Sequence, residues 1–131
     1  ALQTDAETQV IRIKAIREEM KYDLKEFTVK AGKPVEIVFE NPDAMQHNIL
    51  IGKPGSLEKI GNAADQMITQ QDAAEKHYIP NVPEIIAASP LVNPGESYRL
   101  KFIAPDQTGD YPFVCTFPGH WRLMSGTMKV E

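Results

Sequence analysis

Short stretches in which apolar residues occupy every second position recur along most of this chain, and they constrain its fold more than any other feature. In PVEIVFE (residues 34–40), for example, Val35, Ile37 and Phe39 alternate with other residues. A period of two places such side chains on one face of a β-strand. The same interpretation applies to eight segments, which are residues 9–16, 26–30, 34–40, 46–52, 84–92, 97–105, 110–117 and 125–131.

The segments between these predicted strands carry the residues that tight turns require. They are AGKP (31–34), NPD (41–43), NPGES (93–97) and PDQTGD (105–110). Gly, Pro, Asn and Asp tolerate or pre-set the backbone angles of a turn. About eight short strands with such connections predict an all-β fold, a Greek-key sandwich or barrel.

Residues 56–78 depart from this alternation. Their apolar residues recur every three or four positions, at Leu57, Ile60, Ala64, Met67 and Ile68. This period is typical of an amphipathic helix. We therefore predict a helical flap of one or two turns packed on the sandwich, with a break near Gly61-Asn62.

The size and charge of the chain limit its domains and its partners. With 131 residues, 42% of them hydrophobic, it fits a single domain over residues 1–131. The net charge of −4 and the lack of a basic run argue against nucleic acid or an anionic membrane as partner. No stretch approaches the roughly 20 apolar residues of a membrane span. The chain begins with Ala1 rather than Met, which leaves open that the domain was cut from a longer chain.

The one cysteine of the chain lies close to a histidine and a methionine. Cys115, His120 and Met124 form a C-x4-H-x3-M pattern that starts near the end of one predicted strand, passes the turn Pro118-Gly119 and ends just before the next predicted strand. A thiolate and a thioether favour Cu(I), whereas an imidazole also accepts Cu(II). A trigonal copper site needs a second histidine, and His47 on another predicted strand could supply it. The sequence therefore predicts a His-Cys-His copper site with an axial methionine.

Each of these residues also has an ordinary structural explanation. A lone cysteine is more often an inert core residue than a ligand. His120 alone could belong to a turn, Met124 alone could fill the core, and His47 alone could be structural. Their combination at loop spacing makes coincidence a poor explanation. His77 has no companion at ligand spacing, and we leave it out of the site.

Two segments resemble a known family. CTFPGHWRLMSGTMKV (115–130) resembles the copper loop of the azurin and auracyanin group of cupredoxins, which are small blue copper proteins. MQHNILIG (45–52) resembles the segment that carries their first histidine. The resemblance covers essentially the whole chain. It implies a cupredoxin-like Greek-key sandwich of about eight strands with a helical flap.

The resemblance also implies a set of ligands for one copper ion. His47 Nδ1, Cys115 Sγ and His120 Nδ1 would bind in a near-plane, with Met124 Sδ as a long axial contact. The carbonyl of Gln46 would approach from the opposite side. Azurins usually have glycine at the position of Gln46, and this difference brings the chain closer to auracyanins. The disulfide of typical azurins is impossible with one cysteine.

Several further residues are expected around the metal. Asn48 should join the two ligand segments, through a side-chain hydrogen bond to Thr116 and a backbone N–H donated to the thiolate of Cys115. The resemblance supports the Asn48–Thr116 pairing. An apolar shell should keep water from the metal, and its expected members are Met45, Phe113, Phe117 and Leu123.

A closed site that suits both copper oxidation states is typical of electron transfer. We expect the ring edge of His120 to lie near solvent and Trp121 and Leu123 to form a docking patch. Burial of Trp121 against the flap is an equally open alternative. The expected partners are transient redox proteins such as cytochrome-like or dehydrogenase domains, docking on a monomer through small interfaces.

Three other functions stay open from the residues alone. A multicopper oxidase or nitrite reductase would need more ligands than three histidines can supply, so an enzyme is disfavoured. A copper carrier or storage protein would favour an exposed site. The third alternative is a copper-binding redox domain of a larger oxidoreductase. The resemblance implies an extracytoplasmic location, in the bacterial periplasm or tethered to a membrane.

Overall fold

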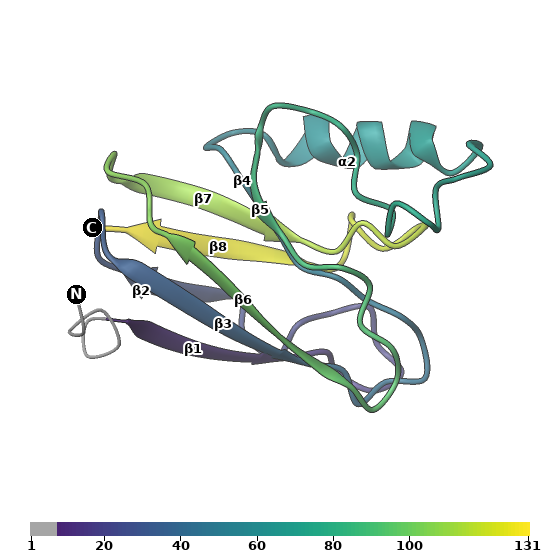
Figure 1. Ribbon diagram of the computed structural model, residues 1–131, viewed down its shortest axis with the longest axis horizontal. Helices are drawn as coiled ribbons and strands as arrows, with labels where there is room; N and C mark the ends of the chain where they lie inside the picture. The colour runs from purple at the N-terminus through teal and green to yellow at the C-terminus, as the bar shows by residue number, and fades with distance from the viewer. Residues whose placement is uncertain (1–7) are drawn as a thin grey trace.

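The structure is a computed structural model that describes residues 8–131, and it is built from eight strands and one helix (Figure 1). Ala1, which raised the question of a longer chain, lies outside the described residues. The elements are β1 (Gln9–Lys14), β2 (Glu26–Val29), β3 (Pro34–Glu40), β4 (Leu50–Gly52), α2 (Leu57–Met67), β5 (Ile85–Ala88), β6 (Ser97–Ile103), β7 (Gly109–Val114) and β8 (Ser125–Val130).

The strands form two sheets, one in the order β1-β3-β6 and one in the order β2-β8-β7-β4-β5 (Figure 1). The pairs β1–β3 and β2–β8 are parallel, and the remaining pairs are antiparallel. Neighbouring strands are often not consecutive in the chain, as expected for Greek-key connections. The predicted all-β sandwich of about eight strands is confirmed.

The core lies between the two sheets, and the alternation seen in the sequence explains it. Ile37 and Phe39 of β3 are fully buried, and Phe113 of β7 is fully buried on the facing sheet. Tyr22 lies between them, with its ring centroid 5.8 Å from that of Phe39 and 5.2 Å from that of Phe113. Aromatic contacts of this kind add to the burial of apolar area.

Two predicted strands have less than half of their predicted length in the structure. The segment 46–52 contributes only Leu50–Gly52 as a strand, and 84–92 contributes only Ile85–Ala88. Their outer parts meet instead through one isolated bridge between His47 and Val92. The regular pairing of these two segments therefore ends before His47.

The predicted break in the helical flap is wrong. Helix α2 runs without interruption through Gly61, and only residues 68–78 leave the helix to form successive turns. Only glycine fits at position 61, because the ring of Trp121 lies against the helix there and a Cβ at Gly61 would lie 2.1 Å from that ring. This glycine thus permits close packing rather than ending the helix. No helix within residues 8–131 is long and apolar enough to cross a membrane.

Candidate metal centre

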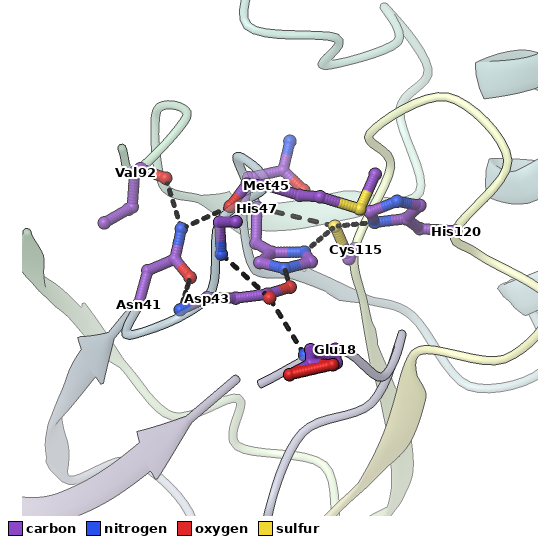
Figure 2. Close-up of polar contacts among 10 residues, drawn as sticks. Glu18, Asn41, Asp43, Met45, His47, Val92, Cys115 and His120 are labelled. Atoms are coloured by element: carbon purple, nitrogen blue, oxygen red, sulfur yellow. Dashed lines mark hydrogen bonds and ion pairs between the residues drawn. The ribbon is translucent and has the colours of Figure 1, made fainter. Parts of the chain in front are cut away.

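Three buried side chains meet at one end of the sandwich (Figure 2). Sγ of Cys115 lies 3.8 Å from Nδ1 of His47 and 3.7 Å from Nδ1 of His120. The three donor atoms lie within 4.8 Å of one another, and this is the one such group of His, Cys, Asp or Glu among the described residues. The side chains of the two histidines and the cysteine are at most 1% exposed.

The sheet register brings these residues together from distant parts of the chain. Strand β4 pairs antiparallel with β7, so that Leu50 faces Val114. His47 precedes Leu50 and Cys115 follows Val114, so the register carries both to the same end of the sheet. His47 is held there by two backbone hydrogen bonds with Val92, of 3.3 and 2.7 Å.

The loop after β7 supplies the remaining histidine and the methionine. The N–H of Cys115 donates to the carbonyl of Met124 at 3.0 Å, which closes the loop at its base. The N–H of His120 donates to Phe117 O, and the N–H of Met124 donates to His120 O, both at 2.9 Å. Gly119 adopts a φ of +83°, which favours glycine at this turn. The Met124 side chain is fully buried.

Asn48 connects the two ligand segments. Its backbone N–H donates to Sγ of Cys115 at 3.5 Å. Its side chain accepts the N–H of Thr116 at 2.8 Å and donates to Oγ1 of Thr116 at 2.9 Å. Asn48 also donates to the carbonyl of His77 at 3.0 Å, so His77 contributes its backbone to this support and not its ring. The neighbouring Gln46 donates its side-chain amide to Asn93 Oδ1 at 2.7 Å.

Asp43 is part of the site, although the sequence analysis does not single it out. Its Oδ2 lies 2.8 Å from Nε2 of His47, and its Oδ1 accepts the backbone N–H groups of Glu18 and Ala44 (Figure 2). Burial opposes ionisation of Asp43, but the hydrogen bonds from Glu18, His47 and Ala44 outweigh it and lower the pKa. The available signal was an acidic residue four positions before the histidine.

The expected apolar shell is only partly present. Phe113 is fully buried, and the ring of Phe117 lies 5.0 Å from that of His120 between centroids. Met45 and Leu123, in contrast, are 44% and 58% exposed. Both lie in irregular segments outside the strands, so the alternation that buries strand residues does not apply to them.

His120 and Trp121 are buried rather than exposed. We expected the ring edge of His120 near solvent, but Phe117 and His47 pack on its ring and its Nε2 is buried without a hydrogen-bond partner. Of the two alternatives for Trp121, burial against the flap holds, since the side chain is 8% exposed. Its Nε1–H donates to Asp65 of α2 at 3.1 Å.

Burial sets the protonation of the metal-free site, in which Cys115 carries a proton and a metal ion must displace it. Burial raises the pKa of Cys115 to about 12, although N–H groups of Asn48 and Phe117 oppose the rise. Burial, and then the charge of His47, lower the pKa of His120 to about 4. One sulfur and two imidazole nitrogens, enclosed together, match the donors that copper and zinc prefer. The residues present thus fit a bound copper ion.

Comparisons with known proteins agree with this donor set. The family model of copper-binding proteins of the plastocyanin/azurin family matches residues 9–131. Auracyanin-A of Chloroflexus aurantiacus is 40% identical over 123 residues, which cover 92% of this chain and 74% of that protein. Azurin of Achromobacter denitrificans is 30% identical over 122 residues, which cover 86% of this chain and 78% of that protein.

The same likeness extends to the three-dimensional structure. The solved structure of auracyanin A, a "blue" copper protein from Chloroflexus aurantiacus, matches with a TM-score of 0.85 and 37% identity. The match covers 95% of this chain and 99% of that chain. Auracyanin and azurin are electron carriers and not enzymes, and the alternatives left open by the sequence find no support among these relatives. The chain belongs to the plastocyanin/azurin family of copper-binding proteins and is an electron-transfer protein with one type 1 copper site.

Proposed function

We propose that this protein shuttles single electrons between transient protein partners through a copper ion held by His47, Cys115 and His120. The observation that carries the proposal is the enclosed His-Cys-His cluster, whose donor atoms lie within 4.8 Å of one another. A bound copper ion would supply the Cu(II)/Cu(I) couple, which carries one electron. The buried ligands leave little room for a substrate.

The chain holds these ligands in place from several sides. Asn48 ties the segment of His47 to Thr116, and the hydrogen bond from Cys115 to Met124 closes the other ligand loop. Supports of this kind limit the rearrangement of the ligands when an electron arrives or leaves. A small rearrangement is what rapid electron transfer requires.

Met124 is proposed as the weak axial ligand and the carbonyl of Gln46 as the opposite axial contact. Met124 is fully buried and lies on the loop that carries Cys115 and His120. A thioether at this position is a usual axial donor of blue copper sites. Gln46 directly precedes His47, which brings its carbonyl to the same end of the sheet.

Leu123 and Met45 are proposed as the docking patch for redox partners. Both are exposed apolar side chains, and each belongs to a segment that carries a copper ligand. Trp121, which we expected in this patch, is buried and instead fastens the ligand loop to α2. Cytochrome-like or dehydrogenase domains are the expected partners, and interfaces below about 1,200 Å² suit their rapid release.

The location and the extent of the protein are also proposals. We expect an extracytoplasmic protein, free in the bacterial periplasm or tethered to a membrane, because the resemblance to azurins and auracyanins implies it. We treat residues 1–131 as one domain, either free-standing or part of a longer chain.

Addition of Cu(II) to the metal-free protein tests the copper assignment. We expect binding at one ion per chain and an intense thiolate-to-copper absorption band in the visible region. Cys115→Ser should abolish the band, because the transition originates on that sulfur. A colourless copper complex of the unaltered protein would contradict the assignment.

A further inference from the structure

We propose that Asp43 is a positioning residue of the copper site, which orients His47 and shifts the copper couple toward Cu(II). The proposal rests on the copper-binding function assigned above. Three observations carry it, namely the hydrogen bonds of the Asp43 carboxylate, its burial, and the contrast between His47 and His120.

The hydrogen bonds determine which nitrogen of His47 carries the proton. Oδ1 of Asp43 accepts the N–H of Glu18 at 3.0 Å and the N–H of Ala44 at 2.8 Å. Oδ2 lies 2.8 Å from Nε2 of His47. An ionised carboxylate only accepts hydrogen bonds. Nε2 of His47 is therefore the donor, and Nδ1 keeps its lone pair on the side of Cys115 (Figure 2).

The carboxylate is held rigidly in the protein interior. Asp43 is 4% exposed and Asn41 is 1% exposed. Oδ1 of Asn41 accepts the N–H of Asp43 at 3.0 Å, and Nδ2 of Asn41 donates to the carbonyls of Met45 and Val92 at 2.8 Å each. Val92 in turn pairs with the backbone of His47. The segment from Asn41 to His47 thus places the carboxylate behind the ring.

A buried carboxylate is costly unless it is hydrogen-bonded, and Oδ2 of Asp43 here accepts from Nε2 of His47. The other histidine of the site lacks such a partner, because Nε2 of His120 is buried without a hydrogen bond. The two imidazoles therefore differ in their environment. A carboxylate behind a ligating histidine increases the basicity of the ligand and fixes its ring orientation. Negative charge at this distance stabilises Cu(II) more than Cu(I).

Asp43→Asn tests this role. An amide cannot satisfy the N–H groups of Glu18 and Ala44 with one end and accept from His47 with its other end. Loss of such an outer partner lowers metal affinity about 10- to 100-fold. We expect most of this loss to fall on Cu(II), so that the ratio of Cu(II) affinity to Cu(I) affinity falls about tenfold. A tenfold change corresponds to a rise of about 59 mV in the reduction potential of a one-electron couple. Voltammetry of the copper-loaded protein measures the potential.

A matched control removes the same charge elsewhere. Asp23 is exposed and its carboxylate also accepts a backbone N–H, that of Lys14 at 2.9 Å. Asp23→Asn should leave the affinity ratio within about a factor of two of the unaltered protein, because solvent screens a surface charge. An equal shift in both variants would reduce the effect to net charge and would overturn the proposal.

A second measurement needs no metal and separates this proposal from the copper function. Nitrogen-15 NMR of the metal-free protein reports the tautomer of each histidine. We expect the Nε2–H tautomer of His47 in the unaltered protein and its loss in Asp43→Asn. An Nδ1–H tautomer in the unaltered protein overturns the proposal even if the variant does not fold. An unchanged potential in a folded Asp43→Asn variant overturns it as well. Failure of the unaltered protein to form the blue site would instead count against the copper function.

Discussion

The indole ring of Trp121 packs against Gly61 so closely that no side chain fits at this position of helix α2. A Cβ on Gly61 would lie 2.1 Å from the ring. The same helix supplies Asp65, which accepts hydrogen bonds from Nε1 of Trp121 and from the guanidinium of Arg122. The helix thus fastens the loop that carries His120.

The first prediction follows from this contact. Gly61→Ala should destabilise the protein by about 2 kcal/mol, because an overpacking cost of about 3 kcal/mol outweighs a gain in helix propensity of roughly 1 kcal/mol. Urea unfolding of the metal-free protein measures the change. Asn62→Ala, at an exposed position of the same helix, is the control and should be neutral or slightly stabilising. Equal stability of Gly61→Ala and the unaltered protein would show that Trp121 can move aside.

Much of the fold follows from local patterns that a sequence shows directly. The segment 34–40 alternates, and it forms β3 over the same residues. The helical period after Ser56 likewise gives α2. Gly61 misled the prediction because helix propensity treats glycine as a breaker, whereas here a tertiary contact requires it. Such a contact joins residues far apart in the chain and leaves no local signal.

The site was predictable where its chemistry is concentrated in a few rare residues. Cys115, His120 and His47 meet in the structure. The signal in the sequence was that soft donor side chains follow one another closely enough to belong to one loop. Asp43 was missed because an aspartate in a turn segment such as NPD has an ordinary explanation. The exposure of Leu123 and the burial of His120 depend on how the loop packs, which the order of residues does not reveal.

The thiol of Cys115 should make metal binding depend on pH. Because burial raises its pKa to about 12, the metal-free site holds a proton on sulfur at neutral pH. Binding of Zn²⁺, a redox-inert probe, should release about one proton per ion, and the affinity should rise about tenfold per pH unit near neutrality. Calorimetry in buffers of different ionisation enthalpy counts the protons. Cys115→Ser should release none, and an equal release from this variant would contradict the assignment.

Acid should destabilise the metal-free protein through His120. Its pKa lies at about 4 in the folded chain against an ordinary value of 6.5, mainly because burial disfavours the charged ring. The unfolded chain therefore binds a proton first as the pH falls, so stability present above about pH 6.5 is lost toward pH 4. We expect a loss of up to about 3 kcal/mol from this group. Urea unfolding between these pH values should show a smaller loss for His120→Asn, and parallel curves would exclude His120 as the source.

Met124 should tune the potential if its thioether donates to copper. Met124→Leu should keep the blue band and raise the reduction potential, because loss of a donor destabilises Cu(II) more than Cu(I). Met124→Gln should lower the potential by offering a harder oxygen donor. Voltammetry and electron paramagnetic resonance of both variants provide the comparison. Unchanged potentials in both would restrict Met124 to packing in the core.

Leu123 should control how fast the protein exchanges electrons with a second copy or a partner. Its side chain is 58% exposed and lies three residues after His120, whereas the buried Trp121 is unsuited to this test. Leu123→Glu should slow electron self-exchange, because two like charges meet in the encounter complex and must also be desolvated. Higher salt should restore part of the rate, since screening shortens the range of the added charge.

The matched control for this last experiment is Ile103→Glu. Ile103 is exposed to a similar extent, 61%, but it ends strand β6 in the sheet that carries no copper ligand. Both variants add the same charge to the same net total, so any general repulsion between molecules is common to them. A slower rate in Leu123→Glu alone, with an unaltered copper spectrum, places the electron route beside the loop of His120. Equal rates in the two variants would place it on another face, and the surface of α2 would be tested next.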